Sequence, residues 1–192
     1  MAATDRARRL DDDWQPISSV IDFWKDAGAK GLWFAKDVGF DRRFRERFLD
    51  LHLAVAARRH ENWIESAEGA LALLILTDQF PRNAFRGTAH MYATDPLARH
   101  YAQLARAASY MDQVEAALRL FFCLPFAHSE EMADQDISIE LNARLGQPWL
   151  EHAEGHRDII RRFGRFPHRN PLLGRVATAE EEAFLKAGGF RG

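Results

Sequence analysis

The sequence predicts an all-α protein, an antiparallel array of about seven to eight helices with no significant β-sheet. Apolar residues recur at spacings of three and four along most of the chain, which is the period of one helix face. No segment of four to eight residues alternates between apolar and polar side chains as a half-buried strand does. Proline and glycine interrupt the periodic segments at short intervals. Short connections should therefore join neighbouring helices, either in a bundle or in a stack of helix pairs.

The chain is predicted to start with a charged, mobile tail over residues 1–14, followed by a single helical domain over residues 15–192. The tail carries several arginines and then three consecutive aspartates, with no apolar stretch. The first helix is expected to end at Gly28 and Gly31, and its apolar stripe comprises Ile17, Val20, Ile21 and Trp24.

Two more helices are expected before residue 81. Asp41 is the predicted cap of the second helix, whose apolar stripe includes Phe44 and Phe48. The third should run from about Asn62 to Leu76. Its last two turns are apolar on all sides, so this helix should lie at the centre of the fold. Pro81 has no backbone N–H and is not expected to continue it.

Capping residues and helix breakers mark the boundaries of the later helices. The expected boundaries are Thr94-Asp95-Pro96 at the start of one helix, Asp112 to Pro125, Ser129 to Gly146, Pro148 to Gly164, and a capping box of Thr178 and Glu181 opening a last short helix.

Composition excludes several classes of protein. The chain has 192 residues, 47% of them hydrophobic, which is enough for a full core, and its formal net charge of −2 argues against a general nucleic-acid binder. No apolar run approaches the roughly 18 residues of a membrane span, and the first residues lack the apolar region of a secretory signal. Cys123 is the only cysteine and is expected to be a buried, inert thiol. We therefore expect a cytoplasmic protein without membrane or nucleic-acid partners, and a homodimer stays open.

Three polar segments stand out against this background. The first, Asp78–Asn83, follows the most apolar helix, and there Asp78 could hold Arg82 in a bidentate pair while Asn83 bonds free carbonyls. The alternative is that Arg82 and Asn83 only cap a helix end.

The second segment is Leu124–Glu131. Ser129 as a cap would place Glu130 and Glu131 in a first helical turn, where the helix dipole favours carboxylates. His128 precedes the cap and could act as a base, a ligand or simply a packed imidazole.

The third segment is His156–Asn170. His156 shares the buried face of its helix, and Arg165, His168, Arg169 and Asn170 then crowd into a short loop stiffened by prolines. So many donors in a rigid loop suit a carboxylate or a phosphate, although the same side chains could instead tie down helix ends. Residues 156–175 hold six arginines and one aspartate, so a concentrated positive segment lies within an otherwise acidic chain.

No metal or cofactor site is indicated. His152 and His156 are four residues apart, but Glu154 lies on another helix face, so the zinc-protease pattern is absent. Phosphate-binding and dinucleotide-binding glycine motifs are also absent. Any cofactor is therefore unknown.

Several motifs in the same order resemble the bacterial family catalogued as domain of unknown function 924, which is assigned a tetratricopeptide-like helical fold. The resemblance spans roughly residues 20–190, and departs from the family pattern at Thr77 and Val176. It implies a fold rather than a reaction, because the family is mostly described as uncharacterised. The matching stretches are Trp33-Phe34, Phe40-Asp41, Leu76–Asn83, Leu124–Glu130, His156, Arg165–Asn170, Leu173–Arg175, Thr178 and Glu181.

The leading hypothesis from the sequence is one polar pocket at the ends of the central helices, built from the three segments. Its ligand-binding candidates for a small anionic molecule or a peptide carboxylate are Asp78, Arg82, Asn83, Arg165, Arg169 and Asn170, and its acid–base candidates are His128, His156 and His168 with Glu130 or Glu131. Two alternatives remain open. The protein could be a tetratricopeptide-type scaffold that binds a peptide in an open groove, or the motifs could form a purely structural hydrogen-bond network.

Overall fold

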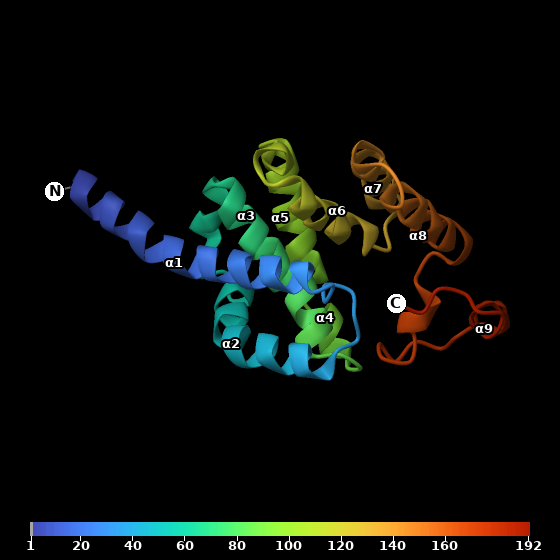
Figure 1. Ribbon diagram of the computed structural model, residues 1–192. Helices are drawn as coiled ribbons and strands as arrows, with labels where there is room; N and C mark the ends of the chain where they lie inside the picture. The colour runs from blue at the N-terminus through green and yellow to red at the C-terminus, as the bar shows by residue number, and fades with distance from the viewer. Residues whose placement is uncertain (1) are drawn as a thin grey trace.

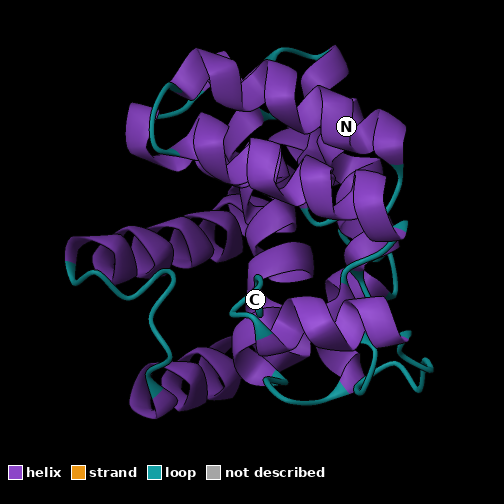
Figure 2. Ribbon diagram, turned by 90° about the vertical axis from the view of Figure 1, so that its right-hand side faces the viewer, coloured by secondary structure: helices purple, strands orange, loops and turns teal. Residues whose placement is uncertain are grey.

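The computed structural model describes the backbone of residues 2–192 and the side chains of residues 15–192. Within this part of the chain every regular element is helical and no strand occurs (Figure 2). The predicted all-α class is therefore confirmed. The tail expected over residues 1–14 lies outside the residues whose side chains are described, and its mobility stays a prediction.

The segments that join the α-helices range from short turns to the long loop between α8 and α9, and several contain 3₁₀ turns. Their bounds are α1 Ala2–Ala29, α2 Val38–Ala56, α3 Ala67–Leu74, α4 Phe80–Ala84, α5 Asp95–Ala107, α6 Leu120–Ala127, α7 Met132–Leu145, α8 Trp149–Phe163 and α9 Ala179–Lys186.

The apolar helix α3 lies at the centre, as its sequence predicts. It packs against α1, α5 and α6, and all its side chains from Ala70 to Leu74 are buried. The main hydrophobic core surrounds it and includes a stack of aromatic rings from α1 and α2, with Phe44 and Trp24 at 5.4 Å between ring centroids. Burial of this apolar area is the main contribution to the stability of the fold.

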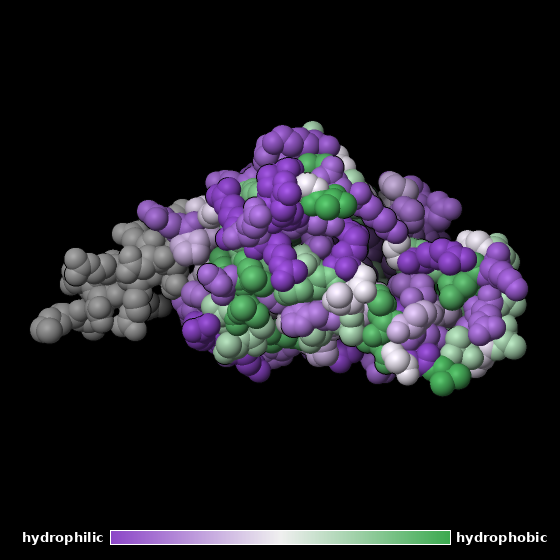
Figure 3. Space-filling view, turned by 90° about the horizontal axis from the view of Figure 1, so that it is seen from below, coloured by the Kyte–Doolittle hydropathy of each residue, from purple (hydrophilic) through white to green (hydrophobic). Residues whose placement is uncertain are grey.

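A smaller core lies at the other end of the molecule, where α7 and α8 pack side by side and α9 follows (Figure 1). Ile159, Ile160 and Phe166 form this second cluster, with Phe163 and Phe184 packed against it. On the face seen in Figure 3, hydrophilic residues cover much of the surface and hydrophobic ones interrupt them in small groups. In the described part of the chain, no helix is both long and apolar enough to cross a bilayer.

Two predicted caps are wrong. Asp37 caps α2, because its Oδ1 accepts a hydrogen bond from the backbone N–H of Phe40 at 2.6 Å, whereas Asp41 lies one turn further on. Ser129 does not cap α7, whose N-cap is Glu131. The Ser129 hydroxyl instead accepts from the N–H of Glu131 at 3.2 Å and donates to Asp134 at 2.7 Å.

The helix predicted from Asn62 to Leu76 is interrupted near its start. A 3₁₀ turn over Glu61–Glu65 comes first, and Ser66 then caps α3 by accepting from the N–H of Gly69 at 3.1 Å. A side chain at residue 69 would collide with the backbone carbonyl of Trp63, since a Cβ there would lie 2.0 Å from its oxygen. Glycine at this position therefore permits the close contact between the turn and the helix.

The prolines do not end helices where expected. Between α3 and α4 a π-helical turn, Ile75–Gln79, carries the chain forward, and Pro81 lies in the first turn of α4. The N–H groups of a first helical turn have no carbonyl acceptor within the helix, so proline, which lacks an N–H, is tolerated there. Pro125 lies inside α6, which continues to Ala127. The start predicted at Asp112 is also wrong, because Asp112 lies in a 3₁₀ turn and α6 starts at Leu120 after a second one. The boundaries predicted at Pro148, Gly164 and the Thr178 capping box are confirmed.

Candidate functional site

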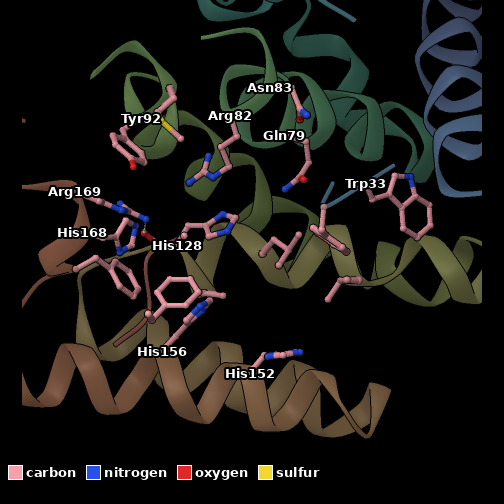
Figure 4. Close-up of a pocket in the computed structure, with 18 of the residues that line it drawn as sticks. Trp33, Gln79, Arg82, Asn83, Tyr92, His128, His152, His156, His168 and Arg169 are labelled. Carbon is pink, nitrogen blue, oxygen red and sulfur yellow. Dashed lines mark hydrogen bonds between the residues drawn. The ribbon is translucent and has the colours of Figure 1, made fainter. Parts of the chain in front are cut away.

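The three polar segments come together around one cavity of about 440 Å³ (Figure 4). The π turn and α4 form one side, the end of α6 the second, and α8 with the loop after it the third. Described by their chemistry, its main lining residues are an apolar group of Trp33, Phe34, Leu120, Leu124, Trp149 and Ala153, and a polar group of Gln79, Arg82, Asn83, Tyr92, His128, His152, His156, His168 and Arg169.

Asp78 lies behind the cavity wall, where the π turn buries it to 1% exposure. Its Oδ2 accepts from Nε2 of Gln79 at 2.6 Å, and its Oδ1 lies 2.8 Å from Nδ1 of His128. Arg82 approaches the same oxygen at 3.2 Å. Burial alone would raise the pKa of the Asp78 carboxyl, but Arg82 and His128 outweigh this effect and lower it to about 2. Asp78 is therefore ionised at neutral pH, and its carboxylate holds the guanidinium of Arg82 and the imidazole of His128 in place.

Pro81 has no N–H, so one backbone donor is missing just after the π turn. Side chains from three places contact the carbonyls of this turn. Nδ1 of His52 lies 2.9 Å from the oxygen of Leu76, and the Thr94 hydroxyl donates to the oxygen of Thr77 at 2.6 Å. Arg82 donates to the oxygen of Asp78 at 2.7 Å. These bonds hold the turn that places Asp78 and Gln79 beside the cavity.

Arg82 makes its bidentate pair with Asp95, so the predicted bidentate pair with Asp78 is wrong. Nη1 and Nη2 of Arg82 lie 2.9 and 3.1 Å from the two carboxylate oxygens of Asp95, the first residue of α5. Arg82 makes only one, longer contact with the carboxylate of Asp78, at 3.2 Å. Sequence alone gave Asp95 only the role of a helix start, because its partner lies thirteen residues away on another helix.

Arg169 is the most enclosed of the cavity arginines, at 7% exposure. Its guanidinium lies between the rings of Tyr92 and Phe166, 4.6 and 4.7 Å from their centroids. Nη2 donates to the backbone oxygen of His128 at 2.9 Å, but Nη1 reaches Asp95 only at 3.4 Å. Nε has no hydrogen-bond partner among the described residues. Burial, and then the nearby charge of Arg82, lower the pKa of Arg169.

The three predicted histidines all line the cavity and are neutral at pH 7. Burial and the charge of Arg82 lower the pKa of His128. Burial is also the main cause that lowers the pKa of His156 to about 3 and that of His168 to about 4. In His128, Nδ1 faces the Asp78 carboxylate, so this nitrogen carries the proton and Nε2 is left with its lone pair.

The apolar end of the cavity was not predicted from the sequence. Trp33 donates its indole N–H to the backbone oxygen of Trp24 at 2.6 Å, and its ring lies against Gly28, where a Cβ would come within 2.3 Å of it. The ring centroids of Phe34 and Trp149 lie 6.1 Å apart, with the two rings tilted at 55°. Large aromatic residues occur throughout this chain, so their types alone do not separate a cavity wall from the core.

Besides Asp78, four predicted residues do not line the cavity. Arg165 pairs with Glu181 through Nε at 2.6 Å and Nη2 at 2.9 Å, and Asn170 donates to the same carboxylate at 3.3 Å. Glu130 accepts from the backbone N–H of Phe166 at 2.9 Å and pairs with Arg175, while Glu131 is exposed. These contacts shape the loop that carries His168 and Arg169.

Asn83 lines the cavity and is buried, and its side-chain amide donates to Asp41 at 2.7 Å rather than to a carbonyl. His152 and Tyr92 also line the cavity. The sequence indicated His152 through its spacing of four residues from His156, whereas nothing in the sequence indicated Tyr92. Within the described residues, no three His, Cys, Asp or Glu side chains are placed to hold a metal ion together.

Comparison with known proteins gives a family and a related structure. A family model described as a bacterial protein of unknown function, DUF924, matches residues 20–189. A solved structure of a protein of unknown function from Agrobacterium tumefaciens is similar in sequence and fold, with 53% identity and a TM-score of 0.87. The similarity covers 90% of this chain and 97% of that one. No curated protein matches the chain.

Proposed function

The chain belongs to the bacterial DUF924 family of unknown function, and from its cavity we propose that it binds a small molecule with an apolar body and an anionic end. The volume of about 440 Å³ falls within the range of small-molecule sites. Such sites are mostly apolar and carry a few convergent polar groups that orient the ligand. The division of this wall into an aromatic end and an arginine–histidine end has that character (Figure 4).

The state of Arg169 carries the proposal. A buried guanidinium is costly unless several acceptors surround it, and Arg169 has one good acceptor, one long contact and an unpaired Nε. Arg82 contacts both Asp78 and Asp95, whereas the only carboxylate that Arg169 reaches among the described residues is Asp95, at 3.4 Å. A ligand carboxylate beside Arg169 would give this guanidinium a closer anionic partner and raise the pKa that burial lowers.

The peptide-scaffold alternative fits less well. An open groove for an extended peptide would present its arginines along an exposed surface. Here the side chains of Arg82 and Arg169 are only 15% and 8% exposed. The enclosed position of both charges favours a compact ligand over an extended chain.

The experiment is an NMR titration with phenylacetate and with its uncharged analogue 2-phenylethanol. We expect wild-type protein to bind phenylacetate more tightly, and Arg169→Gln to lose that preference, with affinity falling about tenfold or more because one charge-assisted contact is removed. Arg106→Gln is the matched control, since Arg106 forms an exposed pair with Glu140 on α5 and α7. Equal affinity of the wild-type protein for both compounds would contradict an anion site.

A second candidate function, acid–base catalysis, is favoured by the hydrogen bond between His128 and Asp78. A neutral imidazole with Nδ1–H held by a buried carboxylate presents Nε2 as a proton acceptor. Hydrolysis of 4-nitrophenyl acetate tests this role: water attacks the ester carbonyl, gives a proton to His128, and nitrophenolate leaves with acetic acid as the other product. His128→Gln should lose the protein-dependent rate, while the exposed His100→Gln keeps it. An unchanged rate in His128→Gln would reject catalysis by this residue.

A further inference from the structure

We propose that the rings of His156, Phe166 and His168 form a subsite for a planar aromatic group of the ligand, and that the chain's own Phe190 fills this subsite here. The proposal rests on the proposed function, because it specifies the apolar body of the same ligand. It concerns residues beyond α9 that sequence analysis did not assign to any role.

Phe190 lies among three aromatic rings. Its centroid is 4.7 Å from that of His156, 5.2 Å from that of His168 and 6.3 Å from that of Phe166. The interplanar angles of 61°, 84° and 56° correspond to edge-to-face and tilted contacts, which aromatic pairs favour at these separations. A ligand ring in the same place would make the same contacts.

Phe190 is held less firmly than the rings around it. It is 41% exposed, whereas Phe166 is 1% exposed. The segment that carries it follows α9 through Gly188, whose φ of +89° is a conformation that glycine adopts without strain. Beyond Phe190 the segment has few polar contacts: Arg191 bonds the oxygen of Leu185, and Lys36 reaches the oxygen of Gly192 at 3.4 Å. Phe190 can therefore be displaced without disturbing the cores.

A second cavity adjoins the first one at Phe190. Phe190 lines the central cavity and also a more open hollow of about 560 Å³ along α8, together with His152 and His156. Phe190 thus forms the partition between the two spaces. A ligand whose ring replaces Phe190 would enter from this hollow.

The chemistry of the subsite selects an aromatic carboxylate. His156 and His168 are uncharged at neutral pH, because burial lowers the pKa of each. Neither imidazole therefore places a charge beside an apolar ring bound in the subsite. Arg169 and Phe190 both contact the ring of Phe166, with the guanidinium 4.7 Å and the Phe190 centroid 6.3 Å from its centroid. A ligand with a ring in the subsite can therefore place a nearby carboxylate against Arg169.

The test uses benzyl alcohol, which has a ring and no charge, and cyclohexylmethanol, which lacks aromaticity. In an NMR titration, Phe190→Ala should bind benzyl alcohol about tenfold or more tightly than the wild-type protein, since the competing ring is gone and a buried ring is worth one to two orders of magnitude in affinity. The imidazole signals of His156 and His168 should shift, and cyclohexylmethanol should gain less. Unchanged affinity in Phe190→Ala, or binding without shifts at these two histidines, would overturn the subsite.

Two further variants keep the result interpretable. Leu53→Ala removes an exposed apolar side chain that lines neither cavity and should not increase the affinity for benzyl alcohol. Phe190→Leu keeps an apolar side chain, so it secures the comparison if Phe190→Ala does not fold. Because benzyl alcohol is uncharged, this test is separate from the anion site: equal binding of phenylacetate and 2-phenylethanol would reject the anion site alone.

Discussion

The Asp78 carboxylate lies 2.8 Å from Nδ1 of His128, although fifty residues separate them in the sequence. The contact joins the π turn after α3 to the end of α6, the two helices at the centre of the fold. Both groups are enclosed, with side-chain exposures of 2% and 18%. The same atoms therefore set the geometry of the cavity and contribute to the stability of the core.

Acid should weaken the protein through Asp78. Its pKa is lowered from 3.8 to about 2, so its ionised form stabilises the native state above pH 4, and this contribution disappears as the pH falls through about 2. The contribution is about 2 kcal/mol. In urea unfolding between pH 4.5 and 2, Asp78→Asn should show a flatter loss of stability than the wild-type protein. Asp136→Asn, which alters an exposed carboxylate with one distant arginine partner, should keep the wild-type slope.

The buried histidines should act over a higher pH range. The pKa values of His156 and His168 are lowered from 6.5 to about 3 and about 4. Between those values and 6.5 the unfolded chain binds protons that the native protein does not, so the free energy of unfolding falls as the pH decreases from 6.5. The full loss is about 5 kcal/mol for His156 and about 3 kcal/mol for His168. His156→Gln should reduce the pH dependence of urea unfolding between pH 6.5 and 4, and His100→Gln should not.

Local patterns predicted the elements well because their causes are local. Helical spacing located the central helix, and the Thr178–Glu181 capping box depends on residues three apart. The prolines misled the prediction because their effect depends on distant side chains. Pro81 is tolerated in the first turn of α4, and the side chains of His52 and Thr94 bond carbonyls of the π turn just before it.

The candidate site was predicted in part for the same reason. Dense polar motifs next to apolar helices located Arg82, His128, His156, His168 and Arg169, which do line one cavity. Sequence did not distinguish these from Arg165, because an arginine facing a cavity and one paired to a distant glutamate look alike in a linear motif. Asp95 and the aromatic end of the cavity depend on tertiary contacts with no local signature.

The π turn should show energetic coupling between Pro81 and Thr94. Thr94→Val leaves the carbonyl of Thr77 without its donor and should lower the free energy of unfolding by about 1–3 kcal/mol. In a Pro81→Ala background the restored N–H can bond this carbonyl, so the same substitution should cost less. A double-mutant cycle in urea measures the difference. Strict additivity would contradict this account, and Thr88→Val, which removes an exposed hydroxyl–carbonyl bond, serves as the control.

The thiol of Cys123 should be protected until the protein unfolds. It is fully buried in α6, and burial raises its pKa to about 12. At about pH 8 only roughly one molecule in 10⁴ carries the reactive thiolate. A chromogenic disulfide reagent should therefore react no faster than the native protein opens, and at once in guanidinium. Rapid reaction of the folded protein would show that α6 is more accessible than its packing indicates.

Arg165 should matter for stability and not for ligand binding. Its guanidinium is committed to Glu181, which is 2% exposed and whose pKa it helps to lower to about 2. Arg165→Gln removes both bonds from this carboxylate and leaves it with Asn170 and the backbone of Thr178. The melting temperature should fall, while the affinity for phenylacetate should stay within about twofold of the wild-type value, because the pair lies outside the cavity. Arg169→Gln should instead lose more affinity for phenylacetate than Arg165→Gln does, with a smaller fall in melting temperature. If Arg165→Gln instead abolishes phenylacetate binding while the protein stays folded, the Arg165–Glu181 pair is needed to position Arg169 for the ligand.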